Sequence, residues 1–205
     1  MRASRRVRFL RESDMRQFTD AEIIARVESL STFEGWKPGI YDVWVRSKAD
    51  LFDVFDDKCF TYQVHSKGSK PVFIMGRRGT TNAGSYGLKH FNDYNHEGCA
   101  VLKADWMIYG SHTYGNHKGK PAYRQAKPWP YFRDNNKNNR AEEIGPEHNN
   151  MIGANVHRAG VNSTVIKNWS TACLVTAVLS TFLTWLGFMK KNHYPPLNVA
   201  ILKEF

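Results

Sequence analysis

The sequence predicts a mostly β protein with one helix near each end of the chain. Segments rich in aromatic and β-branched residues recur between residues 39 and 134, and short polar connections that contain glycine separate them. Apolar residues at helical spacing occur before and after this region. Strands joined by short connections favour an antiparallel sheet. We therefore expect a β-sandwich or a curled sheet, with a single sizeable core.

A capping box predicts the first helix. Thr19 and Glu22 have the capping-box spacing, and Phe18 and Ile23 are placed for a hydrophobic staple. The apolar residues that follow share one face of the helix, which is expected to pack on the main domain. They are Ile23, Ile24, Val27 and Leu30.

Six segments between the helices are predicted as strands, and one further strand is expected in YPPLNVAILKEF at the end of the chain. A polar loop is expected after residue 133. The six segments are IYDVWVRSK, CFTYQVHS, KPVFIMG, YGLKHF, GCAVLKADW and KPWPYFRD.

Charge and cysteine content limit the partners and the compartment. The 29 Lys and Arg against 19 Asp and Glu give a net charge of +10, which favours nucleic acid, an acidic cell-wall polymer or a membrane surface as partner. Three cysteines without a CxxC pair argue against a disulfide framework. The N-terminal segment has no continuous apolar stretch of the kind found in secretory signals, so synthesis in the cytoplasm is expected. Its arginines form a basic arm, expected to be a solvated terminus, with a nucleic-acid or membrane arm as the alternative. They are Arg2, Arg5, Arg6, Arg8 and Arg11.

An apolar run of eighteen residues, 172–189, has no formal charge and is of borderline length for crossing a bilayer. Wound as a helix, it places Thr176, Ser180 and Thr184 on one face and most of its large apolar residues on the other. This segregation favours a buried amphipathic helix over residues 174–188 and disfavours a membrane span.

Cys173 would then lie in the first turn of that helix, sixteen residues after His157. Exposed amides and the dipole at a helix start stabilise a thiolate and can form an oxyanion hole. His157 is the nearest upstream candidate for the general base, and Ser170 could cap the helix or donate a hydrogen bond in the site. The alternative is a buried, inert thiol and a surface histidine.

The arrangement resembles the L,D-transpeptidase (YkuD-type) catalytic domain, in which a histidine precedes a Ser/Thr-His-Gly-Cys motif at this spacing. Here the motif positions are Ser170-Thr171-Ala172-Cys173. The segment 74–88, with 80–84 at its turn, stands where the family has an upstream strand and turn. Bacteriophage members of the family are closer still. The segments that resemble them are 41–47, 55–57, 132–136, 155–159 and 169–173.

The resemblance covers residues 35–205, which leaves 1–34 as a basic arm and helix. It implies a mostly β catalytic domain of L,D-transpeptidase type that attacks the peptide stem of peptidoglycan and forms a thioester through Cys173. In this reading His157 is the general base and acid, Ser170 is an orienting group, and no cofactor or metal takes part. The residues that it places close to the substrate are Asn155, Arg158, Trp169, Thr171 and Ala172.

Transfer of the acyl group to water gives cleavage, and transfer to an amine gives a cross-link. For a phage protein, cleavage suits cell entry or lysis better. The expected partners are bacterial peptidoglycan and other virion proteins, with no nucleic acid and no membrane span. Synthesis is expected in the host cytoplasm without a signal peptide, followed by action in the cell envelope or within the virion.

Three departures from the family pattern keep alternatives open. Thr171 and Ala172 replace His-Gly, and Val175 replaces an Arg that contacts substrate, a contact that Arg158 is placed to supply. One alternative is therefore a catalytically inactive virion or wall-binding protein on the same fold. Another is a membrane-associated lysis factor that uses the apolar run.

Two metal-binding patterns are also present in the sequence. Asp134, Asn136 and Asn138 alternate like calcium ligands, but Gly and Glu are missing from the positions where such a loop needs them. We therefore expect a polar loop there. Four histidines are candidate zinc ligands. Because the sequence has no HExxH motif, we expect them to be surface histidines. They are His90, His96, His112 and His117.

Overall fold

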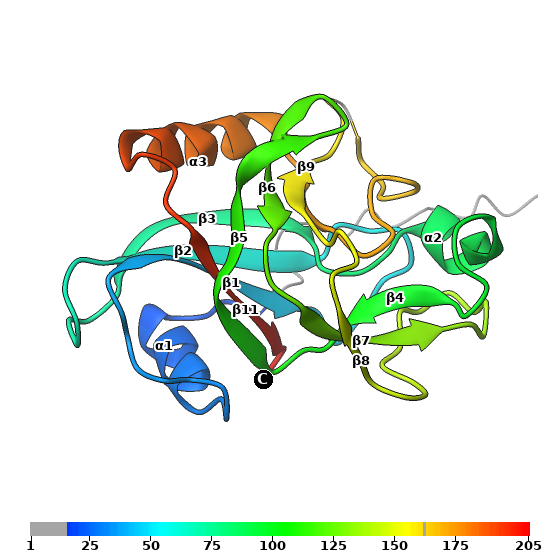
Figure 1. Ribbon diagram of the computed structural model, residues 1–205, viewed down its shortest axis with the longest axis horizontal. Coiled ribbons are helices and arrows are strands. Elements are labelled where there is room, and N and C mark those ends of the chain that lie inside the picture. Colours follow the sequence, from blue (N-terminus) through cyan, green and yellow to red (C-terminus); the bar gives the residue numbers. More distant parts are fainter. Residues whose placement is uncertain (1–15, 162) are drawn as a thin grey trace, which may run out of the picture.

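The structure, a computed structural model, describes residues 16–161 and 163–205. The basic arm at Arg2–Arg11 lies outside these residues. Eight strands form the largest sheet: β1 (Gly39–Arg46), β2 (Asp57–Val64), β3 (Val72–Thr80), β5 (Trp106–His117), β6 (Lys120–Gln125), β9 (Val156–Arg158), β10 (Leu174–Thr176) and β11 (Leu197–Lys203). They close into a barrel in the order β1-β11-β5-β6-β9-β10-β3-β2 (Figure 1). The prediction of a mostly β protein is confirmed.

A second, three-stranded sheet lies beside this barrel in the order β4-β7-β8 (Figure 1). Its strands are β4 (Cys99–Leu102), β7 (Trp129–Asp134) and β8 (His148–Asn150). The helices are α1 (Asp20–Glu28), α2 (Ser85–Lys89), the short 3-10 helix η2 (Phe91–Asp93) and α3 (Leu179–Lys191). The two sheets share one core, because Leu102 and Trp129 pack in the same cluster as Trp44 of the barrel.

The large sheet is mixed, whereas the short connections predicted an antiparallel one. The pairs β1–β11 and β9–β10 are parallel, and the other pairs are antiparallel. A tight turn can join only antiparallel neighbours. The two parallel pairs are joined instead by long stretches of chain, and the sequence pattern within the strands carries no sign of these pairings.

Strand β1 lies between two cores. Ile40 and Trp44 point into the barrel, whereas Tyr41, Val43 and Val45 contact a second cluster beneath α1. This alternation follows the two-residue period of a strand and explains why nearly all of β1 is buried.

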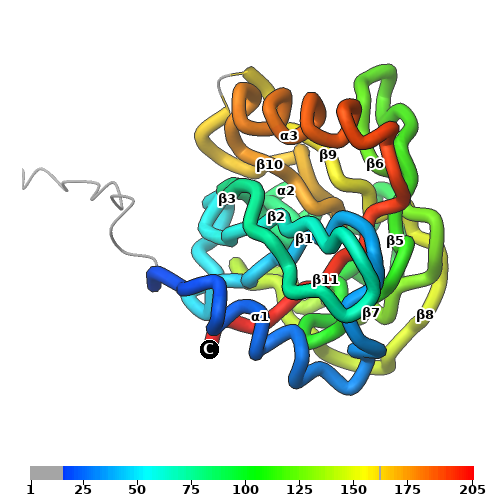
Figure 2. The backbone as a smooth tube through the Cα atoms, turned by 90° about the vertical axis from the view of Figure 1, so that its left-hand side faces the viewer, coloured from blue at the N-terminus to red at the C-terminus, as the bar shows by residue number. Residues whose placement is uncertain are grey.

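The first helix forms as its capping box predicts. Thr19 Oγ1 accepts from the Glu22 amide, and the Glu22 side chain accepts from the Thr19 amide. Ile23 and Val27 are fully buried against the barrel, as the apolar face predicted. Helices α1 and α3 cover opposite sides of the barrel (Figures 1 and 2).

One predicted strand is wrong. The segment YGLKHF forms α2 and the start of η2. Leu88 and Phe91 lie three residues apart and share a small core with Ala83 and Cys99, which a helical turn allows and an extended strand does not. A short apolar run leaves helix and strand equally open, and here tertiary packing selects the helix.

The prediction for the apolar run is wrong at its start. Residues 174–176 form β10, and α3 begins only at Leu179. Because β10 is buried on both faces, its sequence has the same continuous apolar character as a buried helix. The helical wheel also misplaces Leu183, which is 54% exposed, whereas Phe182 and Trp185 are buried in the core. No helix in the described part of the chain is long and apolar enough to cross a membrane.

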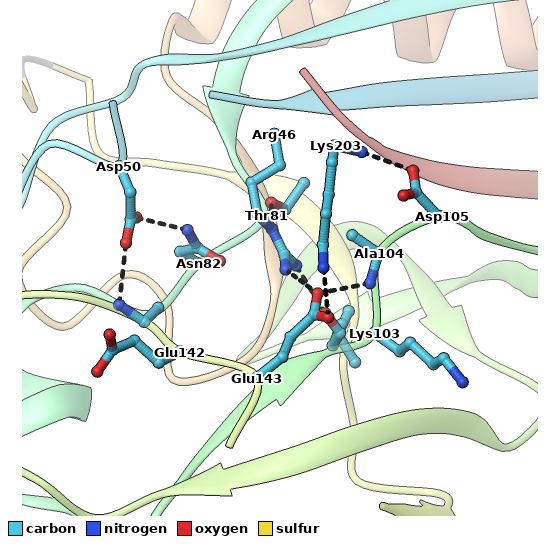
Figure 3. A network of polar contacts seen from close by, with 12 residues as sticks. Arg46, Asp50, Thr81, Asn82, Lys103, Ala104, Asp105, Glu142, Glu143 and Lys203 are labelled. Carbon is cyan, nitrogen blue, oxygen red and sulfur yellow. Dashed lines mark hydrogen bonds and ion pairs between the residues drawn. The ribbon is translucent and has the colours of Figure 1, made fainter. Parts of the chain in front are cut away.

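The predicted polar loop after β7 is tied to the barrel by charge (Figure 3). Glu143 forms ion pairs of 3.0 Å with both Arg46 and Lys203, and it accepts from the Ala104 amide at 2.8 Å. The Arg46 guanidinium also donates to the Leu102 carbonyl at 2.8 Å. The loop is therefore a fixed part of the protein surface at this end of β1 and β11.

Candidate active site

Parallel pairing of β9 and β10 brings His157 and Cys173 together. Val156 pairs with Leu174 and His157 with Val175, and the Leu174 amide donates to the Asn155 carbonyl at 3.0 Å. Cys173 directly precedes β10, so it lies beside the start of β9. A ring nitrogen of His157 and the Cys173 Sγ lie within 4.8 Å of each other.

The site lies outside the barrel core. Val156 and Leu174 belong to the core that contains Trp44, whereas Cys173 and Val175 pack in a separate cluster that includes Ile166. Successive residues of a strand point to opposite faces of its sheet. His157 and Cys173 therefore share the outer face of the sheet.

The orientation of the His157 ring is set by one hydrogen bond. Nδ1 lies 2.9 Å from the Arg158 carbonyl oxygen, which only accepts, so Nδ1 carries the proton. Nε2 then holds a lone pair, and it is buried without a hydrogen-bond partner. This is the tautomer that a general base for a thiol needs.

Burial keeps both reacting groups neutral. It lowers the pKa of His157 to about 4, an effect that the Arg158 carbonyl opposes and that the nearby positive charge of Lys118 reinforces. Burial raises the pKa of Cys173 to about 11, against a backbone hydrogen bond from Asn155 and the charge of Lys118. The thiol donates to the Gly153 carbonyl at 3.6 Å. At neutral pH the site holds a thiol and a neutral imidazole.

The prediction that Cys173 lies at the start of a helix and is stabilised there as a thiolate is therefore wrong. Cys173 enters a strand, six residues before α3 begins, so the helix dipole and the free amides of a first turn do not act on its sulfur. The same finding removes the predicted helix-capping role of Ser170. Its hydroxyl instead donates to the Cys173 carbonyl at 2.8 Å, and its own carbonyl accepts from the Gly84 amide at 3.0 Å.

Ser170 thus holds the turn that presents Cys173. The other two motif residues lie in the same turn. The Thr171 carbonyl accepts from the Cys99 thiol at 3.6 Å, and Ala172 is 7% exposed. The hydrogen bonds of Ser170 and Thr171 fix the backbone just before the nucleophile candidate.

The remaining predicted residues surround the dyad with different contacts. Asn155 is buried, and its Oδ1 accepts from the Gln125 amide at 3.0 Å. Arg158 follows His157 in β9 and donates to the Ala159 carbonyl at 2.9 Å. Trp169 is 39% exposed in the turn before Cys173. Asn155 therefore positions neighbouring groups, whereas Trp169 is open to a ligand.

His117 is a member of the site that the sequence analysis did not assign to it. Its ring stacks on His157 with centroids 4.7 Å apart, and its Nδ1 accepts from Asn155 Nδ2 at 3.0 Å. Lys118 and Gly119 both have positive φ and form the tight turn between β5 and β6. The Lys-Gly pair was the available signal, because a hairpin there places His117 beside the strand that pairs with β9.

The four histidines considered as zinc ligands do not come together. His112 is buried, with Nε2 2.7 Å from the Ala154 carbonyl, and His90 stacks on Tyr86 at the surface. Within the described residues, the one group of three or more His, Cys, Asp or Glu side chains at metal-binding distances is His117, His157 and Cys173. Histidine positions alone did not reveal a cluster that includes a cysteine.

In the candidate calcium loop, the chain itself uses the side-chain oxygens. Asp134 accepts from the amides of Asn136 and Glu142 at 3.2 and 3.0 Å. Asn136 and Asn138 donate to Glu142 Oε2 at 2.5 and 2.7 Å. These contacts are those of a self-closed polar loop.

Two of the motif segments, 80–84 and 55–57, meet beside the site, where Phe55 packs in the same cluster as Cys173. Thr80, at the end of β3, pairs with Val175 of β10. Thr81 donates from its amide and its hydroxyl to Asp57, in the segment 55–57, at 2.6 and 2.7 Å. The turn at Gly84 then contacts the backbone of Lys167. Comparisons with protein-family models, with curated proteins and with solved structures find no match.

Proposed function

We propose that this chain is a cysteine-dependent acyl-transfer enzyme of L,D-transpeptidase type that acts on the peptide stem of peptidoglycan. The observation that carries the proposal is the unpartnered Nε2 of His157 in a buried site beside Cys173. A buried polar nitrogen without a partner is destabilising, and it is retained where it takes part in chemistry.

The reaction runs through a thioester. His157 Nε2 removes the proton from the Cys173 thiol as Sγ attacks the carbonyl carbon of the scissile amide. The protonated imidazole then gives that proton to the leaving nitrogen, the C–N bond breaks, and the acyl group stays on sulfur. Water, deprotonated by His157, attacks the thioester and releases a carboxylic acid and the free thiol.

Two neutral partners suit this concerted transfer. Separate charges on sulfur and imidazole would each be costly in a site where Cys173 and His157 are 7% and 6% exposed. If the proton moves only when the substrate is bound, no free thiolate forms in the buried site. The negative charge that leaves the sulfur then develops on the carbonyl oxygen of the substrate. Substrate binding is therefore part of the activation of the thiol.

Basic residues around the site support an anionic substrate. Lys118 and Lys120 are exposed beside His117, and Arg158 follows His157. Together with the net charge of +10, they favour approach to an acidic cell-wall polymer. The motif resemblance favours a phage enzyme that cleaves the stem in the cell envelope, with water as the acceptor.

The rival function is a wall-binding or virion protein on the same fold without catalysis. It is favoured by the low exposure of both reacting groups and by Thr171-Ala172 in place of His-Gly. Trp169, which is 39% exposed in the turn before Cys173, would suit binding as well as catalysis. A binding protein would sediment with peptidoglycan but leave its muropeptides unchanged.

The two functions separate in one experiment. Purified wild type, Cys173→Ala and the control Cys59→Ala, whose thiol lies in the barrel core outside the site, are incubated with peptidoglycan, and the muropeptides are identified by mass spectrometry. We expect shortened stems with wild type and Cys59→Ala and none with Cys173→Ala. Unchanged muropeptides with a folded wild type, together with co-sedimentation, would establish the rival.

A further inference from the structure

A cluster of three metal-ligating side chains lies in the site. One ligand atom from each of His117, His157 and Cys173 lies within 4.8 Å of the others. They come from the end of β5, from β9 and from the residue before β10, so three separate segments of the chain hold them. The cluster contains no carboxylate, and such a nitrogen and sulfur set suits Zn²⁺ or another soft cation rather than calcium or magnesium.

A second observation points to a ligand at this cluster. His157 is 6% exposed, and its Nε2 has no hydrogen-bond partner, so a buried lone pair is free. Its Nδ1–H donates to the Arg158 carbonyl at 2.9 Å. Metal-binding histidines commonly donate their second ring N–H to a backbone carbonyl or carboxylate, so His157 already has that arrangement.

We propose that His117, His157 and Cys173 form a zinc-binding site with an open fourth position. In tetrahedral zinc sites the metal lies about 2.0 Å from nitrogen and about 2.3 Å from sulfur, which places ligand atoms roughly 3.5 Å apart. Closing the cluster from its present spacing takes about an ångström of side-chain movement. Binding displaces the thiol proton to solvent, forms one Zn–S and two Zn–N bonds, and changes no oxidation state.

Asn155 sets how readily His117 joins the site. The orientation of its amide is fixed, because Oδ1 accepts from the Gln125 amide while Nδ2 donates to His117 Nδ1 at 3.0 Å. The neutral His117 ring therefore carries its proton on Nε2. To bind through Nε2 it must move that proton to Nδ1, where the Asn155 amide cannot accept it. A carboxylate at position 155 would accept it and would free Nε2 for the metal.

Zinc at this site masks the thiol. It occupies the His157 lone pair and the Cys173 sulfur at once, and these are the groups that the acyl transfer needs. This consequence rests on the proposed function, whereas binding of the ion does not. The metal therefore acts as a reversible inhibitor, and the acyl transfer requires the metal-free protein.

The test uses the full chain under reducing conditions, with Zn²⁺ for stoichiometry and Co²⁺ as a spectroscopic probe. Wild type is expected to bind one ion and to show a thiolate-to-cobalt charge-transfer absorption, which Cys173→Ala abolishes. His117→Ala is expected to weaken binding on the order of a hundredfold, and Asn155→Asp to tighten it about tenfold. The control His90→Ala, at an exposed histidine outside the cluster, is expected to bind like wild type.

The metal site would be overturned by a charge-transfer band that persists in Cys173→Ala. It would also be overturned if His117→Ala and Asn155→Asp both bind Zn²⁺ with the affinity of wild type. Circular dichroism confirms that each variant is folded. The Asn155→Asp variant is expected to gain metal affinity, and misfolding cannot cause such a gain. Zn²⁺ is also expected to protect Cys173 from alkylation. Muropeptide analysis is done separately on metal-free protein. Zinc binding without peptidoglycan cleavage would leave the metal site standing and remove only its inhibitory role.

Discussion

His157 and Cys173 meet because the strands that carry them run parallel, with His157 opposite Val175 in the register. A ring nitrogen and the sulfur lie within 4.8 Å on the outer face of the barrel. Sixteen residues of sequence separate the two side chains, and a loop folded against α2 closes that distance. The register, the loop and the ring tautomer together define the chemistry available to the site.

The neutral thiol gives the first prediction. Because burial raises the pKa of Cys173 to about 11, its alkylation by iodoacetamide is expected to be slow at pH 8. The rate should rise about tenfold per pH unit between pH 7 and 10, since the thiolate fraction rises in that proportion. Peptide-resolved mass spectrometry separates Cys173 from Cys59 and Cys99. A rate that levels off below pH 8 would reveal a thiolate–imidazolium pair instead.

Acid is expected to destabilise the fold through two histidines. Burial lowers the pKa of His112 and of His157 to about 4 each. Between pH 6.5 and 4 the unfolded chain binds protons that the folded chain does not, so the free energy of unfolding falls as the pH falls. Each histidine accounts for at most roughly 3 kcal/mol across this window.

The Asp56 carboxyl has the opposite effect on the free energy of unfolding as the pH falls. Burial raises the pKa of its carboxyl to about 7, so between pH 7 and 4 the folded state holds a proton that the unfolded state releases. A comparison of variants isolates the histidine effect. Urea unfolding of wild type and His157→Gln at pH 7 and at pH 4.5 is expected to show a smaller acid loss in the variant. An equal loss in both proteins would contradict the neutral, buried imidazole.

Two glycines form a matched pair for testing the loop before Cys173. A Cβ at Gly84 would collide with the Lys167 carbonyl, and so would displace the turn that Ser170 anchors. Gly84→Ala is therefore expected to destabilise the fold by about 1–3 kcal/mol and to reduce Cys173-dependent activity. Gly187 in α3 has no atom within 4 Å of an added Cβ.

Gly187→Ala is expected to stabilise the fold by about 0.5–1 kcal/mol, because alanine favours the helix. Both stabilities are measured by urea unfolding, and the activities are compared under conditions where both variants are folded. Tolerance of alanine at Gly84 without loss of stability would show that the turn at Gly84 is not tightly packed against the Lys167 backbone.

The buried ion pair in the barrel gives a further prediction. Arg77 contacts Asp42 with both side chains fully buried, and its guanidinium lies 4.2 Å from the Trp185 ring centroid. It also donates to Thr176 in β10 at 3.2 Å. Arg77→Met leaves the buried Asp42 carboxylate with the Thr61 hydroxyl but without its guanidinium partner, and is expected to lower the free energy of unfolding by about 3–5 kcal/mol.

The double variant Asp42→Asn with Arg77→Met should recover part of that loss, because the unpaired charge is gone. Urea unfolding of the two single variants and the double variant forms a complete cycle. A loss below about 1 kcal/mol in Arg77→Met would show that water reaches the pair.

Much of the fold could be predicted because its local signals agree with its packing. The capping box at Thr19 and the aromatic and β-branched residues of β1 were sufficient, since both signals are local. Strand β10 was missed because residues buried on both faces have no period that distinguishes a strand from a helix. The parallel register of β9 with β10 depends on long-range pairing, which no local pattern encodes.

For the site, the sequence supplied the pair but not its environment. The spacing of His157 and Cys173 suggested both residues as candidates, whereas the structure places Cys173 directly before strand β10 and not at the start of a helix. His117 joins them through the β5–β6 hairpin, which Lys118-Gly119 signals, and through the β6–β9 pairing, which no local sequence pattern encodes. The neutral state of the pair follows from burial, which depends on the complete fold.

We propose that Cys173 forms a thioester with the peptide stem of peptidoglycan. To detect it, metal-free wild type is incubated with a purified stem peptide, the reaction is quenched with acid, and the acyl adduct is located by mass spectrometry. We predict an adduct on the peptide that contains Cys173, none on Cys59 or Cys99, and faster accumulation than in His157→Gln. The proposed chemistry would be contradicted if folded wild type carries no adduct on Cys173, whether or not the stem peptide is cleaved.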